Sequence, residues 1–260
     1  MTNALAGVRV LVTRPEEQAR ELAHMIEAEG GEAILFPALT IVPVADLAAV
    51  RAKIGAITDY GLVVFVSRNA VTHGLALLGP ATAPGPQIAA IGPSTAAALE
   101  RAGRRVSIRP SAGFTSEALL AEPALRKLHG RRVLIVRGGG GRELLADTLT
   151  ARGAHVTYAE VYERRPNSGD ASALLRRWRR DGIALVTALS VETLDALHAQ
   201  LGDDAGDLFA RSQLVTASAR VIKRAAALGL TGVVTATGPD DRALLEAMIA
   251  WRRAGRAASE

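Results

Sequence analysis

The feature that most constrains this fold is an internal repeat, in which two parts of the chain match at a constant spacing of 123 residues. The match runs without a gap across a strand, a helix and a second strand. The repeat pairs Gly7 with Gly130, Arg14 with Arg137, Leu22 with Leu145, Gly30 with Gly153 and Pro43 with Pro166. Chance does not hold one offset over such a length, so we expect two similar halves.

The first copy of the repeat has the pattern of a strand followed by a helix and another strand. Residues 8–13 are short, β-branched and bounded by Gly7, which predicts a buried strand. Thr13 and Glu16 have capping-box spacing, and Gly30 ends the predicted helix. Residues 33–36 predict the next strand. The alternation predicts an α/β fold class with flavodoxin-like or Rossmann-like parallel sheets, whose ligands bind beyond the carboxyl ends of the strands.

Beyond this segment the repeat is weaker but continues. Residues 62–67 resemble residues 183–187 after an adjustment of a few positions, with residues 70–71 resembling residues 190–191. Residues 88–91 match residues 214–217 at an offset of 126. Each half is therefore expected to hold about five β-α units.

Two polar segments marked by proline, residues 37–43 and 160–166, occupy equivalent places in the two halves. Two such segments indicate two crossings between domains, which favours insertion of one domain into the other. Residues 1–39 with 166–260 are expected to form one domain, and residues 43–160 the inserted one. The working site is expected in the cleft between the domains.

Composition excludes several classes of function. The net charge of +5 favours anionic partners, although arginine enrichment also follows from high genomic GC content. The chain has no cysteine and five scattered histidines, so neither a metal site nor a disulfide is expected. Its few aromatic residues are not interleaved with basic ones, which argues against nucleic acid as a partner. No apolar run suits a membrane span and residues 1–7 lack a secretory pattern, so a soluble cytoplasmic protein is expected.

Polar residues follow several predicted strands, where helix N-termini expose backbone N–H groups to anions. The first such turn contains Ser67, Arg68, Asn69 and Ala70. Its hydroxyl, guanidinium and amide groups could converge on a carboxylate, or Ser67 could serve only as a helix cap. The residue pattern leaves both interpretations open.

Two more turns resemble anion sites. Gly92 permits close backbone approach, and Ser94 and Thr95 place hydroxyls near a helix start. Gly138 and Gly139 begin a run of four glycines after a strand, but the run satisfies neither phosphate-binding motif. We interpret it as a flexible turn that touches an anionic ligand.

Motifs of ordinary hydrolases are missing, since the sequence contains no G-x-S-x-G, no H-E-x-x-H and no catalytic cysteine. Tyr162 stands out because it lies in the second crossing segment, where a phenol would face the cleft. Simple packing of this tyrosine on the interface is the alternative.

The assembled residues resemble the uroporphyrinogen-III synthase family over nearly the whole chain. The marks of the resemblance are residues 12–15 (VTRP), 65–71 (FVSRNAV), 91–96 (IGPSTA), 133–138 (VLIVRG), 161–164 (VYER) and 218–222 (SARVI). The resemblance implies two flavodoxin-like domains joined by paired linkers, with hydroxymethylbilane bound in the cleft. It also implies that Tyr162 is the family's important tyrosine and that Ser67 and Thr95 are its first-domain hydroxyl positions.

The second half departs from the serine and Gly-Pro-Thr-Thr turns of many relatives, because it reads Thr187-Ala-Leu-Ser190 and Ser218-Ala-Arg220. Thr187 or Ser190 is expected to replace the first hydroxyl, and Arg220 to offer a guanidinium. The full set of expected substrate-binding residues is Thr13, Arg14, Ser67, Arg68, Asn69, Ala70, Gly92, Ser94, Thr95, Arg137, Gly138, Gly139, Thr187, Ser190, Ser218 and Arg220.

The reaction implied by the resemblance needs no metal or cofactor. Hydroxymethylbilane carries eight carboxylates, and its terminal hydroxymethyl group ionises readily to an azafulvene. The protein must then control conformation, and Tyr162 is expected to assist departure of the hydroxyl. A monomer and transient contact with hydroxymethylbilane synthase are also expected. The alternatives are a cytoplasmic two-lobed anion sensor and a nucleotide-dependent transferase, and the latter would need the missing phosphate motifs.

Overall fold

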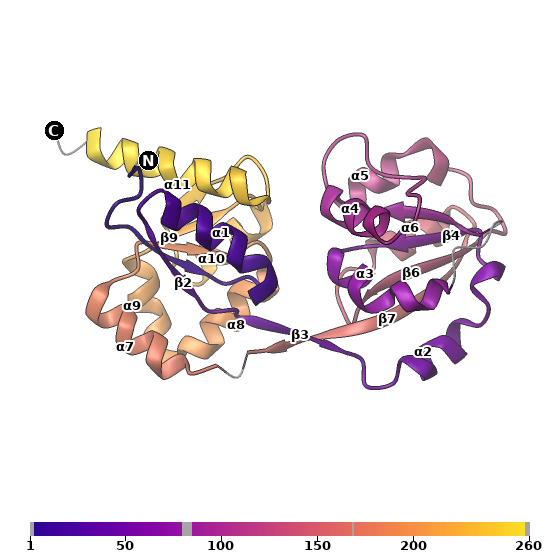
Figure 1. The fold of residues 1–260 in the computed structure, drawn as a ribbon, viewed down its shortest axis with the longest axis horizontal. Helices are drawn as coiled ribbons and strands as arrows, with labels where there is room; N and C mark the ends of the chain where they lie inside the picture. Colours follow the sequence, from indigo (N-terminus) through magenta and orange to yellow (C-terminus); the bar gives the residue numbers. More distant parts are fainter. Residues whose placement is uncertain (1–2, 80–84, 168, 258–260) are drawn as a thin grey trace. The chain divides into compact units, whose positions relative to one another are not determined.

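A computed structural model describes residues 3–79, 85–167 and 169–257. The chain divides into two compact units, which we name unit 1 (Met1–Thr40 with Arg165–Glu260) and unit 2 (Ile41–Arg164). Each unit has a sheet between two layers of helices (Figure 1). The predicted α/β fold class is confirmed, with two sheets that are mostly parallel.

Unit 1 contains, in its described part, a five-stranded parallel sheet of order β10-β9-β8-β1-β2, the flavodoxin-like order. Its strands are β1 (Arg9–Val12), β2 (Glu32–Leu35), β8 (Leu185–Thr187), β9 (Gln213–Thr216) and β10 (Val233–Thr235). Its helices are α1 (Glu16–Ala28), α7 (Ala171–Asp181), α8 (Val191–Leu201), α9 (Ala205–Ala210), α10 (Ala219–Ala227) and α11 (Asp241–Ala257), with a 3₁₀ turn at Gly202–Asp204.

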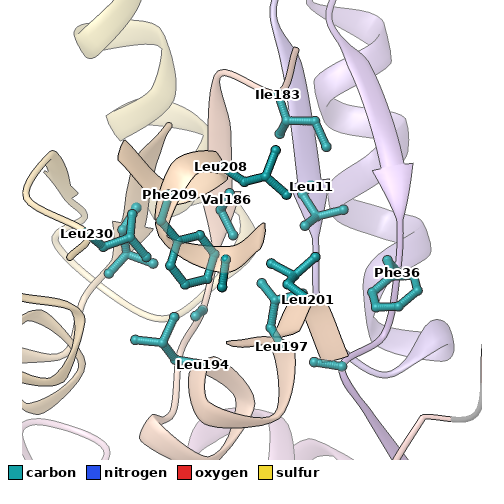
Figure 2. Packing of buried hydrophobic residues seen from close by; sticks show 14 of the residues in the cluster. Leu11, Phe36, Ile183, Val186, Leu194, Leu197, Leu201, Leu208, Phe209 and Leu230 are labelled. Atoms are coloured by element: carbon teal, nitrogen blue, oxygen red, sulfur yellow. The ribbon is translucent and has the colours of Figure 1, made fainter. Parts of the chain in front are cut away.

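Successive residues of the central strand β1 enter opposite cores, because side chains alternate across a strand. Val10 packs with α1 and α11, whereas Leu11 packs with α8 and α9. Figure 2 shows the second core, where Leu11, Val186 and Phe209 come together from two strands and a helix. Both faces of the sheet are therefore covered, and the polar groups that follow the strands remain at its edge.

Unit 2 contains the second sheet, of order β3-β7-β6-β4-β5. The pairs among β7, β6, β4 and β5 are parallel. The sheet consists of β3 (Leu39–Pro43), β4 (Leu62–Phe65), β5 (Gln87–Ala90), β6 (Arg132–Gly138) and β7 (His155–Pro166), of which β3 begins and β7 ends within unit 1. Its helices are α2 (Leu47–Ile54), α3 (Arg68–Gly74), α4 (Pro93–Arg101), α5 (Ser116–Ala121) and α6 (Leu144–Ala151), with 3₁₀ turns at Ile57–Asp59, Leu75–Leu78 and Pro123–Leu125.

The strand registers show how far the repeat extends. β1 pairs with β2 through Arg9 and Glu32, and β6 pairs with β7 through Arg132 and His155, which lie 123 residues further on. The third strands keep the same offset, since β8 pairs Leu185 with Val10 and β4 pairs Leu62 with Val133. The adjustment of a few positions expected for this strand was therefore wrong.

The predicted capping box of Thr13 and Glu16 is also wrong. Pro15 occupies the N-cap position of α1, which has no side-chain cap. The Thr13 hydroxyl instead donates to the carbonyl oxygen of Thr187 on the neighbouring strand. A lateral bond between strand ends has replaced the local helix cap.

Candidate active site

The strand ends of unit 2 gather the predicted hydroxyl and glycine positions on one edge of the sheet. Ser67 follows β4, Gly92 follows β5, and Gly139 follows β6. Because these three strands are parallel neighbours, their carboxyl ends lie at the same edge. Residues distant in the sequence can therefore act together there.

Ser67 caps helix α3. Its hydroxyl oxygen accepts a hydrogen bond of 3.1 Å from the backbone N–H of Ala70, a buried residue. The N–H of Ala70 is thus already bound, whereas the side chain of Arg68 is exposed and Asn69 is half-buried. Of the two interpretations of this turn, the cap is present, and contact with a ligand stays a prediction.

Tyr162 lies in the interior of unit 2, with only 3% of its surface exposed. Its hydroxyl oxygen lies 3.1 Å from that of Ser67 and accepts a 3.3 Å hydrogen bond from Nη1 of Arg164. The ring packs so closely on Gly138 that a Cβ built there would lie 2.4 Å from Cε2 of the tyrosine. The ring is thus a core side chain of unit 2 whose oxygen joins a polar cluster, and the expectation that the phenol faces a cleft stays a prediction.

The turn that follows β6 is bonded to the backbone around Tyr162. The N–H of Gly139 donates to the carbonyl oxygen of Tyr162 at 2.8 Å, and Nη2 of Arg164 donates to the carbonyl oxygen of Gly139 at 3.3 Å. Gly140 and Gly141 have φ of 68° and 103°, a region that favours glycine. The glycine run is therefore a shaped turn attached to the tyrosine.

Arg137 holds this glycine turn from inside. Its side chain is 7% exposed and donates to the carbonyl oxygens of Gly138 and Gly140 and to the carboxylate of Glu143. Its guanidinium also lies 4.5 Å from the centroid of the Tyr158 ring. Nε, Nη1 and Nη2 of Arg137 each donate within this segment, and its predicted contact with substrate stays a prediction.

The same cluster shifts two acid–base equilibria. Burial, followed by the hydrogen bond to Glu143, raises the pKa of Tyr158 to about 12. The hydrogen bond from Tyr158, assisted by Arg137, lowers the pKa of Glu143. Both shifts favour a neutral phenol donating to an ionised carboxylate at neutral pH.

The two hydroxyl side chains of the Gly92 turn differ in their exposure. Pro93 is the first residue of α4, as predicted, and Gly92 occupies the N-cap position with no Cβ contact within 4 Å. Ser94 is exposed, whereas Thr95 is buried. Neither hydroxyl makes a hydrogen bond within the described part of the chain, and contact of Ser94 or Thr95 with a ligand stays a prediction.

In unit 1, two predicted hydroxyls join strands instead. Thr13 and Thr187 are 1% and 0% exposed. The Thr13 hydroxyl donates to the carbonyl oxygen of Thr187, and the Thr187 hydroxyl donates to that of Leu11 at 3.2 Å. Both hydroxyl protons are thus engaged with backbone carbonyls, and contact of either side chain with a ligand stays a prediction.

Arg14 is also engaged within unit 1. It donates to the carboxylate of Asp241 and the carbonyl oxygen of Pro239. These contacts join the turn after β1 to the start of α11. The structure therefore gives this arginine a role in joining two strand-end segments, and a substrate contact stays a prediction.

Ser190 is the counterpart of Ser67 at the offset of 123. It caps α8 by accepting a 3.1 Å hydrogen bond from the N–H of Thr193, as Ser67 caps α3. Ser218 is half-buried at the N-cap of α10 and makes no side-chain cap bond, and Arg220 is exposed on the first turn. Ser190, rather than Thr187, is thus the unit 1 hydroxyl equivalent to Ser67.

Arg164 and His73 are site residues that the sequence analysis did not select. Arg164 contacts the Tyr162 oxygen, and the imidazole centroid of His73 lies 5.8 Å from that of the tyrosine ring. Spacing alone could have indicated Arg164, because residues two apart on a strand face the same side. Nothing in the pattern around His73 distinguished it from the other histidines.

The described ranges contain neither a metal-binding cluster nor a helix that could span a membrane. No group of three or more His, Asp or Glu side chains there has the arrangement to hold a metal ion. None of the helices described is long and apolar enough to span a membrane.

These observations define a class of protein: an α/β protein of two units with mostly parallel sheets, which carries hydroxyls, amides and guanidinium groups near the strand ends. Comparison with known proteins makes the assignment specific. Residues 20–246 match the family model described as uroporphyrinogen-III synthase HemD. The chain therefore belongs to the uroporphyrinogen-III synthase family, whose members are cyclising enzymes, and the resemblance seen in the sequence is confirmed.

Individual relatives agree with this assignment. The uroporphyrinogen-III synthase of Escherichia coli is 32% identical over 92% of this chain and 99% of its own, and that of Salmonella typhimurium is 33% identical over the same shares. Among solved structures, a uroporphyrinogen III synthase mutant from Thermus thermophilus aligns with a TM-score of 0.67 at 19% identity, covering 96% of this chain and 99% of its own. At that identity the structural likeness supports the fold alone.

Proposed function

We propose that this chain converts hydroxymethylbilane to uroporphyrinogen III without a cofactor. The observation that carries the proposal is the match to named uroporphyrinogen-III synthases over 92% of the chain. The match spans both units, so it includes the strand ends that bear the candidate site residues.

The proposed reaction loses one water and forms one ring. The bond from the terminal methylene to its hydroxyl breaks, and the hydroxyl leaves with a proton as water. The resulting azafulvene is attacked by the substituted carbon of ring D, which gives a spiro intermediate. This intermediate fragments and recloses with ring D inverted, and the proton lost on reclosure balances the one taken up by the leaving hydroxyl.

Tyr162 is the proposed proton donor to that leaving hydroxyl. Its hydroxyl already exchanges a hydrogen bond with Ser67, so a substrate oxygen could take the place of the serine as acceptor. Arg164 donates to the same phenol oxygen and would stabilise negative charge that builds there as the proton departs. The buried ring fixes the direction of the phenol O–H bond.

The remaining strand-end groups are proposed to hold the carboxylates of the substrate. Exposed Arg68 and Arg220 offer guanidinium groups, and the turn at Gly92 offers backbone N–H groups without a side chain in the way. Catalysis of this kind depends on positioning a flexible substrate, so several contacts share the work. That the substrate is held between the two units, that the protein is a monomer in the cytoplasm, and that it contacts hydroxymethylbilane synthase stay predictions.

The deciding experiment generates hydroxymethylbilane in situ and adds the purified protein without metal or cofactor. The products are oxidised, and uroporphyrin isomers I and III are separated. Spontaneous closure yields type I, so a shift to type III is expected. Type I alone from demonstrably folded protein would contradict the proposal and favour a non-catalytic binding role.

A further inference from the structure

Phe114 differs from the other aromatic residues of this chain in being exposed. All nine aromatic residues lie in the described ranges, and Phe114 has 51% of its surface exposed, whereas the others are buried or half-buried. A single exposed apolar side chain is ordinary on a protein surface. Phe114 is notable because it lies near the strand ends of unit 2.

The loop that carries Phe114 leaves the sheet of unit 2 at the same edge as the candidate site. Ile108 forms a parallel bridge with Ala89 of β5, and the N–H of Ala90 donates to the carbonyl oxygen of Ile108 at 3.0 Å. Because the pairing is parallel, the chain that follows Ile108 emerges beside the chain that follows β5. Phe114 therefore belongs to the strand-end edge that includes Gly92.

This loop is held in place on both sides of the phenylalanine. The N–H of Ser111 donates to the Glu122 carboxylate at 2.7 Å, and the Thr115 hydroxyl accepts from the N–H of Ala118 at 3.2 Å. Gly113 adopts a φ of 76°, which sets the turn directly before the ring. The ring is thus presented by an anchored loop.

An ion pair connects the same loop to the glycine turn of the site. Arg142 directly follows the glycine run and donates to both carboxylate oxygens of Glu117, at 2.5 and 3.3 Å. Glu117 lies in the first turn of α5, three residues after Phe114. The Phe114 loop and the turn that packs on Tyr162 are therefore parts of one bonded assembly.

We propose that Phe114 positions the substrate by packing its ring against a pyrrole ring of the linear tetrapyrrole. This inference rests on the proposed function. The carboxylates of the substrate can be held by arginines and backbone N–H groups. The faces of its four pyrrole rings are apolar and require an apolar surface. Phe114 supplies one at the edge where the carboxylate-binding groups lie, and an aromatic face restricts the tilt of the ring it covers.

The test compares Phe114→Ala and Phe114→Leu with the wild type in the isomer assay. For the alanine variant we expect KM to rise about 5- to 10-fold and the share of type I product to increase, with a smaller change for leucine. The thermal midpoint should stay unchanged, because the exposed ring contributes little to the core. An unchanged midpoint separates loss of substrate contact from loss of structure.

A binding readout independent of turnover uses Phe114→Trp. Added uroporphyrinogen III under anaerobic conditions should quench the new tryptophan, whereas Lys127→Trp, exposed in the turn before β6, should show no such quenching. A wild type that yields only type I would overturn the proposed function, and this inference with it. A wild type that yields type III, with KM, isomer ratio and quenching all unaffected by changes at Phe114, would overturn this inference alone.

Discussion

The hydroxyl oxygen of Tyr162 lies 3.1 Å from that of Ser67, although 95 residues separate them in the chain. Tyr162 lies on β7 and Ser67 follows β4, and β6 lies between these two strands in the sheet. Gly138 at the end of β6 has no side chain, so the tyrosine ring can cross above it. The arrangement places a phenol proton beside a helix cap, where a substrate oxygen could compete for it.

Changing Tyr162 to Phe should lower kcat on the order of 100-fold, at the lower end of what a positioned proton donor contributes. The ring and its packing remain, so the free energy of unfolding should fall by only about 1 kcal/mol from the lost hydrogen bonds. Steady-state kinetics with isomer separation and urea denaturation provide the two measurements.

Tyr60 offers a matched control in the same unit. It is 2% exposed, and its hydroxyl donates to the carbonyl oxygen of Ile54 at 2.9 Å. Tyr60→Phe should cost a similar free energy of unfolding and leave kcat unchanged. Equal kcat values for the two variants would remove Tyr162 from the mechanism.

Gly138→Ala tests whether the tyrosine must lie where it does. The new Cβ would fall 2.4 Å from Cε2 of Tyr162, and a ring cannot yield as a flexible chain end can. We expect a loss of about 1–3 kcal/mol in the free energy of unfolding, together with reduced kcat as the phenol moves from Ser67. Gly139→Ala is the stability control, because its Cβ would meet nothing closer than 3.9 Å. Equal stability of the two variants would contradict the packing argument.

The two-unit α/β fold could be predicted from the sequence because each copy of the repeat carries its own strand and turn signals. The offset of 123 residues holds for the registers of β1 with β2 and of β6 with β7. The third strand was misaligned because residues 62–67 were matched to residues 183–187, so that Leu62 was aligned with Ile183 rather than with Leu185. Ile183 and Leu185 are both buried aliphatic residues, so hydrophobic pattern alone could not separate the two alignments.

The roles of individual polar groups were harder to predict. Thr13 directly follows β1, and Thr187 and Arg137 lie at the carboxyl ends of β8 and β6, yet all three are buried and donate to nearby backbone carbonyls. Sequence places a group at an edge but does not say whether its side chain turns outward. The Tyr162 contact with Ser67 likewise depends on sheet order, which no local pattern encodes.

Arg137→Met should destabilise the protein by about 2–4 kcal/mol, because it leaves the carbonyl oxygens of the glycine turn without their buried donor. Arg132 is the matched control on the same strand. Its side chain is 45% exposed and forms a 3.0 Å ion pair with Asp59, so Arg132→Met should cost about 1 kcal/mol or less. Denaturation of both variants measures the difference, and similar losses would show that Arg137 does not hold the turn.

The last prediction concerns pH and the ion pair between Glu117 and Arg142. The hydrogen bond from Arg142 lowers the pKa of Glu117 from 4.5 to about 2. A depressed pKa in the folded state means that the pair stabilises the protein above about pH 4.5 and that this contribution is lost as pH falls toward 2. Because both side chains are partly exposed, at 53% and 41%, the contribution should be only about 0.5–1 kcal/mol.

The free energy of unfolding of Glu117→Gln should therefore be about 0.5–1 kcal/mol below that of the wild type at pH 7. This difference should become smaller between pH 4.5 and 3. Urea denaturation at several pH values measures this. Glu100→Gln is the control, because the 3.9 Å separation of Glu100 from Arg109 is too long for a hydrogen bond. The stability difference between Glu100→Gln and the wild type should therefore be smaller at every pH. A gap for Glu117→Gln that stays constant from pH 7 to 3 would show that the ionised carboxylate does not contribute, and that α5 is held to the glycine turn by packing alone.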